Sequence, residues 1–239
     1  MNKGGSKNRH KILDNSLIGL WIIFMSVAGF FLPYFLDSIE FFKVRGVYLE
    51  GNRFLPQDVF FKTLMYFKNN WLFMTEDRFL RTLQSYSGNS VKSLHIKRTF
   101  QKDGVYLTIQ VQEREPLFAA MVEDKVLYFD TDGQPFYYPT FPTPPIIVYT
   151  HSQTYLLEVS KKLVQLTSSL KKLSEDKWEI YLTDGATVLY GEGKKLVLPP
   201  CQEIEEPILS TIERVYNVSK GVKEIVVLRE NLAVVKEKP

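Results

Sequence analysis

Histidine and cysteine, the side chains used most often for metal binding and nucleophilic chemistry, are few in this sequence and widely spaced. The three histidines are His10, His95 and His151, and no two of them stand at the short spacing of a local metal site. Distant residues can still meet in space, as they do in catalytic triads. The single cysteine, Cys201, follows two prolines with no evident base beside it, so we expect a buried or idle thiol. The sequence therefore predicts a protein that is not an enzyme and holds neither a metal nor a cofactor.

Two acidic patterns invite a functional interpretation. Asp130-Thr131-Asp132-Gly133 is similar to the start of a calcium-binding loop, but the glutamate that closes such loops is missing, so we expect a turn. Glu113 and Glu115 stand at alternate positions of a predicted strand, which is ordinary for a solvated surface. Neither pattern changes the prediction that catalytic residues are absent.

Composition sets the broad class of the protein. The chain has 239 residues, of which 45% are hydrophobic and 24% charged, a balance typical of folded proteins rather than disordered or collagen-like ones. The formal net charge of +3 equals the charge of the first fifteen residues, which leaves a neutral remainder. A neutral body lacks the basic surface that gives nucleic-acid affinity, so we expect no nucleic-acid partner.

An apolar segment near the N-terminus organises the rest. Residues 16–36 carry no charge and stand between Asp14 and Asp37. As a helix this segment would be about 31 Å long, close to the hydrocarbon thickness of a bilayer. We therefore predict a transmembrane helix at 16–36 that contacts the lipid bilayer, and the basic residues of the tail at 1–15 place that tail in the cytoplasm. The alternative is a cleaved signal peptide, because Ser26-Val27-Ala28 has the small residues of a cleavage site.

Residues 41–116 are predicted to form a small sheet with helices on one face. A change of buried face in the first strand indicates a bulge at Gly46. Strict alternation from Val105 to Val111 is typical of a strand with one face on a core and one in water. The predicted elements, in chain order, are a strand at 42–49, a helix from Pro56, a helix at 75–83 that Thr75 could cap, and strands at 91–98 and 105–111.

Residues 117–239 are predicted to be mostly β with two helices. Apolar residues recur at three and four positions from Leu156 to Leu170, and Pro207 can open a second helix. A strand is predicted to begin at Trp178, and Asp184-Gly185 is predicted to form the hairpin turn that follows it. The last two strands are predicted at 224–228 and 232–236. The fold class we predict is therefore α+β.

The order of these elements and several short motifs resemble the FtsQ/DivIB family of bacterial cell division proteins, in which a POTRA domain and a β domain follow one membrane span. The motifs are Val47-Tyr48-Leu49-Glu50-Gly51-Asn52, Asn70-Trp71-Leu72-Phe73, Glu113-Arg114-Glu115-Pro116 and, later, Leu127-Tyr128-Phe129-Asp130 and Leu228-Arg229. We expect Gly51 and Asn52 to form a turn and Glu113 and Arg114 to form a solvated strand end, in a motif that Pro116 closes. These residues indicate a fold rather than a chemistry.

The resemblance implies a single-pass protein of the inner membrane, found at the division septum, with its cytoplasmic N-terminus joined to two exported domains. Such a protein links early division proteins to septal cell-wall synthesis by binding FtsB-type and FtsL-type partners and other division proteins. We favour strand addition along the last strand, Leu232 to Val235, as an open sheet edge with whose backbone a partner strand would pair. The predicted partner-binding residues are Arg229, Glu230, Asn231, Leu232, Ala233, Val234, Val235 and Lys236. The alternative is that this edge is already covered by its neighbour and protected by its charged end.

Other functions remain open at this point. One is a membrane-anchored extracytoplasmic hydrolase of the cell wall. Another is a POTRA-bearing factor for envelope assembly or secretion, although the strands after Pro116 are too few and too interrupted by helices for a membrane barrel. A POTRA-like domain also offers its own strand edges as a second interaction surface.

Overall fold

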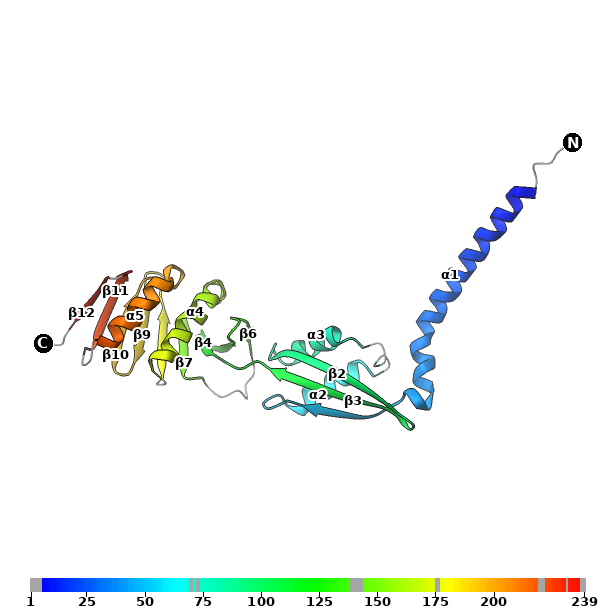
Figure 1. The fold of residues 1–239 in the computed structure, drawn as a ribbon, viewed down its shortest axis with the longest axis horizontal. Coiled ribbons are helices and arrows are strands. Elements are labelled where there is room, and N and C mark those ends of the chain that lie inside the picture. Colours follow the sequence, from blue (N-terminus) through cyan, green and yellow to red (C-terminus); the bar gives the residue numbers. More distant parts are fainter. Residues whose placement is uncertain are drawn as a thin grey trace. The chain divides into compact units, whose positions relative to one another are not determined.

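The chain folds into two α+β units (Figure 1). The structure is a computed structural model that describes residues 6–68, 71, 74–137, 144–174, 177–218, 222–230 and 232–236. The first unit comprises Met1–Asn52, Gln57–Thr82 and Leu94–Val111, and the second comprises Arg53–Pro56, Leu83–Ser93 and Gln112–Pro239. Residues 53–56 and 83–93, which the predicted domain at 41–116 includes, thus group with the second unit.

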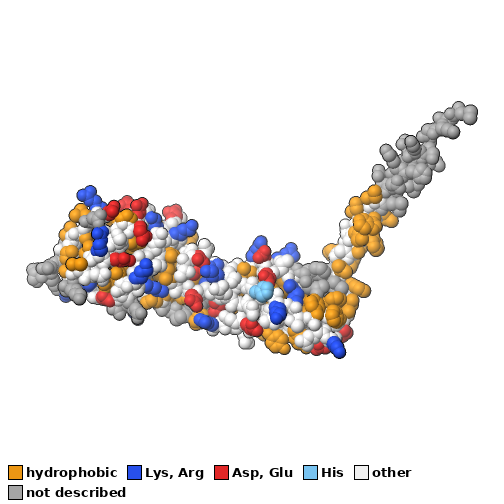
Figure 2. All heavy atoms as spheres, viewed as in Figure 1, with side chains coloured by type: hydrophobic (Ala, Val, Ile, Leu, Met, Phe, Trp, Pro, Cys, Tyr) orange, Lys and Arg blue, Asp and Glu red, His pale blue; other side chains and the backbone are white. Residues whose placement is uncertain are grey.

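Helix α1 (Ser6–Ser38) begins within the predicted tail at 1–15 and runs through the predicted span at 16–36. Its described side chains between residues 18 and 32 are almost all exposed and mostly hydrophobic, as the orange side chains in Figure 2 show. Over the described part of the chain, no helix combines the length and the apolarity needed to cross a membrane. The side chains at 16, 17, 33, 34 and 36 lie outside the described residues, and the membrane span stays a prediction.

The predicted order of strand, helix, helix, strand, strand is confirmed. The strands form a sheet in the order β1-β3-β2, with β1 parallel to β3. A register shift between Val44 and Gly46 confirms the predicted bulge. The elements are η1 (Glu40–Phe42), β1 (Val44–Glu50), α2 (Gln57–Tyr66), α3 (Glu76–Tyr86), β2 (Val91–Gln101) and β3 (Gly104–Glu113).

The core of this sheet follows the alternation seen in the sequence. On β3, Val105, Leu107 and Ile109 are buried, whereas the residues between them are more exposed. Phe79 and Leu83 on α3 are fully buried, because they share one face of that helix. The helix begins as predicted, since the backbone N–H of Arg78 donates to Thr75 Oγ1 at 3.4 Å.

The second unit is a nine-stranded sheet in the order β12-β11-β10-β9-β8-β7-β4-β5-β6. Helices α4 (Gln153–Leu173) and α5 (Glu206–Val218) cover one of its faces (Figure 1). The strands are β4 (Phe118–Val122), β5 (Lys125–Phe129), β6 (Pro135–Phe136), β7 (Ile146–Thr150), β8 (Trp178–Leu182), β9 (Thr187–Gly191), β10 (Lys194–Leu198), β11 (Glu224–Arg229) and β12 (Leu232–Lys236), and η3 (Cys201–Glu203) precedes α5. A mostly β part with two long helices is therefore confirmed.

The covered face of this sheet forms one core. Trp178, Ile180 and Leu182 alternate inward on β8 and join the buried leucines of α4. Gly191 on β9 lies against the Trp178 ring, because a Cβ at this position would stand 2.4 Å from a ring carbon. The indole of Trp178 therefore requires glycine on the neighbouring strand.

Candidate interaction surfaces

Strand β12 ends the nine-stranded sheet and, among the described residues, pairs only with β11. Its register aligns Val235 with Ile225 and Val234 with Val226. Leu232, Val234 and Val235 are 40%, 44% and 42% exposed. An edge strand presents backbone N–H and C=O groups to solvent and can template the pairing of another strand. The last strand is therefore an apolar sheet edge.

The structure brings most of the predicted partner-binding residues together at this edge. Arg229 ends β11 and pairs with Leu232, which begins β12. Glu230 lies exposed in the connection, and Asn231 lies outside the described residues. The remaining five predicted residues, Leu232 to Lys236, are β12 itself, although the side chain of Lys236 is not described.

The opposite edge of the same sheet, β6, is closed. It has two residues, of which Pro135 has no N–H and Phe136 is 2% exposed. The Asn89 side-chain amide donates to the Pro135 carbonyl at 2.9 Å, and the backbone N–H of Tyr137 donates to Gly88 O at 2.8 Å. Backbone groups along β6 are therefore already occupied.

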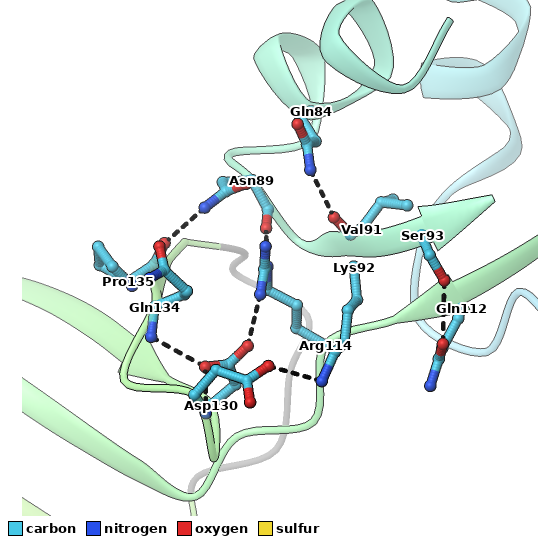
Figure 3. Close-up of polar contacts among 11 residues, drawn as sticks. Gln84, Asn89, Val91, Lys92, Ser93, Gln112, Arg114, Asp130, Gln134 and Pro135 are labelled. Carbon is cyan, nitrogen blue, oxygen red and sulfur yellow. Dashed lines mark hydrogen bonds and ion pairs between the residues drawn. The ribbon is translucent and has the colours of Figure 1, made fainter. Parts of the chain in front are cut away.

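A buried ion pair lies at the turn between β5 and β6 (Figure 3). The Arg114 guanidinium pairs with Asp130 Oδ2, and the two side chains are only 10% and 4% exposed. Arg114 Nε also donates to Asn89 O at 3.0 Å. Asp130 Oδ1 accepts the backbone N–H groups of Asp132 and Gln134, each at 2.9 Å, so residues 130–133 form the predicted turn. This network joins the start of β2, the end of β3 and the β5–β6 turn.

An exposed pair borders the buried one. Lys92 Nζ lies 2.6 Å from Asp132 Oδ2, and both side chains are partly exposed. The hydrogen bond and the charge of Lys92 hold the pKa of Asp132 below its ordinary value. The two aspartates of the turn thus have different partners and different burial.

The expectation that Glu113 and Arg114 form a solvated strand end was wrong. The Glu113 carboxylate accepts the backbone N–H groups of Arg53, Phe54 and Leu55 at 2.9 to 3.0 Å. Because Arg114 reaches the buried Asp130, the two neighbours fix different segments of the chain. This explains physically why residues 53–56 and 83–93 group with the second unit. An exposed-strand interpretation failed because both partners are distant in the sequence.

The other motif residues have structural positions. Gly51 has φ +82°, and a Cβ there would stand 2.3 Å from Val111 O, so the end of β1 requires glycine. Asn52 follows Gly51 directly after the end of β1. Pro116 is half-buried between β3 and β4. These residues position strands and present no reactive group.

An apolar row crosses the face of the nine-stranded sheet that α4 and α5 leave open. The strand registers align its members from one strand to the next. The row consists of Met121, Tyr149, Tyr181, Val188, Val197, Val226 and Val234. Tyr149 and Tyr181 stack with ring centroids 4.7 Å apart. The row ends at β12, so a strand added there would continue it.

A second candidate surface lies beside β1, an edge strand of the three-stranded sheet. A groove of about 540 Å³ runs between β1 and α2, and Arg45, Val47, Phe60, Phe61 and Leu64 are among the residues that line it. Phe61 is 66% exposed. The sequence predicted a second interaction surface along a strand edge of residues 41–116. β1 is such an edge strand, and the groove lies beside it.

The described residues do not assemble a reactive centre from the candidates that the sequence offered. His95 Nδ1 lies 2.8 Å from Glu76 Oε1 on an exposed surface, and the same oxygen accepts the backbone N–H of Ile96. Cys201 is buried, and this burial raises the pKa of its thiol to about 12. No group of three His, Cys, Asp or Glu residues that could hold a metal occurs in the described part of the chain. The side chain of His10 lies outside it.

Comparison of the sequence with protein-family models found no match, and comparison with curated proteins found none either.

Proposed function

We propose that this protein is a membrane-anchored scaffold of the bacterial division machinery, of the FtsQ/DivIB type, that acts by binding partners rather than by catalysis. In this proposal the partners are FtsB-type and FtsL-type proteins, bound outside the inner membrane at the division septum. The observation that carries the proposal is the exposed apolar strand β12 at the end of the nine-stranded sheet.

Strand addition fits the chemistry of this edge. Backbone hydrogen bonds to an edge strand supply affinity, and alternate side chains supply specificity. On β12, Val234 lies in the apolar row of the open face, whereas Val235 pairs with the buried Ile225 of the covered face. A partner strand with apolar residues on both faces would therefore bury more apolar surface than one with a polar face. Arg229, at the end of β11, stands where it could bind a carboxylate.

The membrane anchor is supported by the sequence of residues 16–36. Leu17 to Phe24 are apolar around the whole helix circumference, apart from Gly19. Trp21, Ile22 and Ile23 are each more than half exposed, so no described part of the chain covers them. An apolar helix surface of this size is stable in lipid and costly in water.

The test uses two proline variants of β12, Val234→Pro and Val235→Pro, in the full chain. Successive N–H groups of a strand point to opposite sides, so one proline removes a donor toward β11 and the other removes a donor toward the open edge. We expect the variant that loses the outward donor to stay folded and to lose co-purification with FtsB and FtsL, because Pro also blocks a neighbouring strand.

Near-ultraviolet circular dichroism of the buried Trp178 reports whether each variant is folded. The proposal is contradicted if every variant that folds retains partner binding. If a folded variant loses partner binding, the contact is assigned to the open edge of β12. Both variants introduce proline, so the new side chain itself cannot explain a difference between them.

A further inference from the structure

Two phenylalanines form an exposed aromatic cluster immediately after α1. Phe41 lies in η1, just beyond the helix end at Ser38, and Phe100 lies near the end of β2. Their rings stack with centroids 6.0 Å apart and an interplanar angle of 21°. The two residues are 45% and 50% exposed. Exposed stacked aromatics of this kind indicate a surface that meets another apolar phase.

The cluster is held in place by the chain on both sides of it. The backbone N–H of Val105 donates to Lys43 O at 2.9 Å, and Arg45 Nε donates to Asp103 O at 2.8 Å. Gly104 has φ +144°, and a Cβ there would lie 2.6 Å from Lys43 O. The tip of the β2–β3 hairpin is therefore packed against the segment that follows α1, and Phe100 cannot move far from Phe41.

The short connection to α1 limits how far the cluster can lie from lipid, and this step rests on the proposed membrane anchor. Phe41 stands three positions after Ser38, and this segment spans at most about 11 Å. The polar interface on each side of a bilayer is about 5 to 8 Å thick. Phe41 therefore lies at or near the interface whatever the angle of the helix. Aromatic side chains are enriched at this level.

Lys102 is the cation that can face lipid phosphates, whereas the other two cations near the cluster pair with Glu40. The Asp103 carboxylate at the hairpin tip accepts a hydrogen bond from the Tyr106 hydroxyl. Lys43 Nζ lies 2.8 Å from Glu40 Oε1, and Arg45 also pairs with Glu40. The hydrogen bond and charge of Lys43 lower the pKa of Glu40, so this carboxylate remains a partner of the cations. Lys102 is exposed at the hairpin tip. Long basic side chains can place their stems along apolar surface and their charges among headgroups.

We propose that Phe41, Phe100 and the hairpin tip at 101–104 dock on the outer surface of the bilayer that holds α1, with the aromatic rings at the headgroup boundary and Lys102 toward phosphate. This contact would restrict the tilt of the first unit and set the height of its β1 edge above the membrane.

The experiment places the full chain in vesicles of phosphatidylcholine with a minor fraction of phosphatidylglycerol. A bimane label on Gln101→Cys reports contact with lipids that carry a nitroxide on the headgroup. Cys201 is fully buried and stays unlabelled in the folded protein. The matched control is Gln112→Cys on the same strand pair, about 25 Å farther along β3. We expect at least twofold stronger quenching at position 101 than at position 112.

A double variant, Phe41→Ser with Phe100→Ser, tests whether the rings cause the contact. We expect it to lower the quenching at position 101 by at least half, with the near-ultraviolet signal of the folded units unchanged. Equal quenching at 101 and 112, or quenching at 101 that the double variant leaves intact, would overturn the docking proposal.

The anchor itself is measured separately by Trp21. Lipids with brominated acyl chains should quench Trp21, because Trp71 and Trp178 are buried in the folded units. Quenched Trp21 with unquenched position 101 rejects docking and keeps the anchor. Unquenched Trp21 rejects the anchor and docking together.

Discussion

The two edge strands of the nine-stranded sheet, β6 and β12, differ in length and in exposure. β6 has two residues, one of them proline, and its carbonyl and the following N–H are hydrogen-bonded to residues 88 and 89. β12 has five residues, and three of its aliphatic side chains are exposed. Proteins commonly block sheet edges with short strands, proline or covering segments. Because this sheet blocks one edge by those means and leaves the other apolar and exposed, the difference favours β12 as a binding edge.

Polar contacts hold the β6 edge in place, whereas pairing within the sheet holds the β12 edge. At β6 a buried ion pair, two turn hydrogen bonds and the Asn89 amide hold the last strand. At β12 the described contacts are backbone pairing with β11, packing of Ala233 against the core and contact with α5. Mutations should therefore act on stability at one edge and on partner binding at the other.

The largest expected effect follows from removing the buried carboxylate at the closed edge. Asp130→Ala leaves the Arg114 guanidinium buried without its partner and frees two turn N–H groups. Breaking a buried pair by removing one partner costs about 3 to 5 kcal/mol. We expect a loss of this size in the free energy of unfolding, measured by guanidinium denaturation of the full chain in detergent with Trp178 as the reporter.

Asp130→Asn and Asp132→Ala are the controls for this prediction. The asparagine keeps the oxygen that accepts the turn N–H groups, so its effect should be intermediate. Asp132→Ala removes a carboxylate of the same turn whose side chain is 53% exposed, so its effect should be much smaller. Equal losses for Asp130→Ala and Asp132→Ala would contradict the view that burial of the pair closes this edge.

A smaller effect, on binding rather than stability, is expected from a charge in the middle of the open edge. Val234→Lys places an ammonium on an edge strand, a device by which proteins block strand pairing. We expect affinity for the proposed FtsB-type and FtsL-type partners to fall at least about tenfold, or about 1.4 kcal/mol. The free energy of unfolding should change by no more than about 0.5 kcal/mol, because Val234 is 44% exposed.

Val218→Lys is the matched control, since it makes the same change at an 84% exposed position on α5. It should leave both affinity and stability unaltered. If Val218→Lys weakens binding as much as Val234→Lys, the loss reflects added charge rather than the edge.

The sequence predicted best those elements whose pattern is local. Alternation on β3, the three-and-four spacing of α4 and the bulge at Gly46 can be read without knowing the neighbours. Strands β4, β6, β7 and β10 were missed. β7 has the sequence Ile-Ile-Val-Tyr-Thr, so the residues between its buried positions are also mostly apolar, and such a short run has no readable period.

The candidate edge could be predicted, whereas the closed edge could not. β12 was expected to be an open sheet edge, and the strand order places it at one end of the nine-stranded sheet. The function of Arg114 depends on Asp130, on Asn89 and on their burial, none of which a strand-end motif specifies. Sequence patterns indicate which residues alternate, but they do not show which polar side chains find a distant partner inside the fold.

The smallest expected effect concerns the exposed pair beside the closed edge and its dependence on pH. The pKa of Asp132 is lowered in the folded protein by Lys92, so the pair stabilises the fold above the ordinary value of 3.8 and ceases to do so as the pH falls through the folded value. Asp132→Asn lacks this contribution at every pH. We therefore expect the denaturation midpoint of the unaltered protein to exceed that of Asp132→Asn at neutral pH, and the two midpoints to converge below pH 3.8. A difference that persists in acid would show that Asp132 acts through the geometry of the turn and not through its charge.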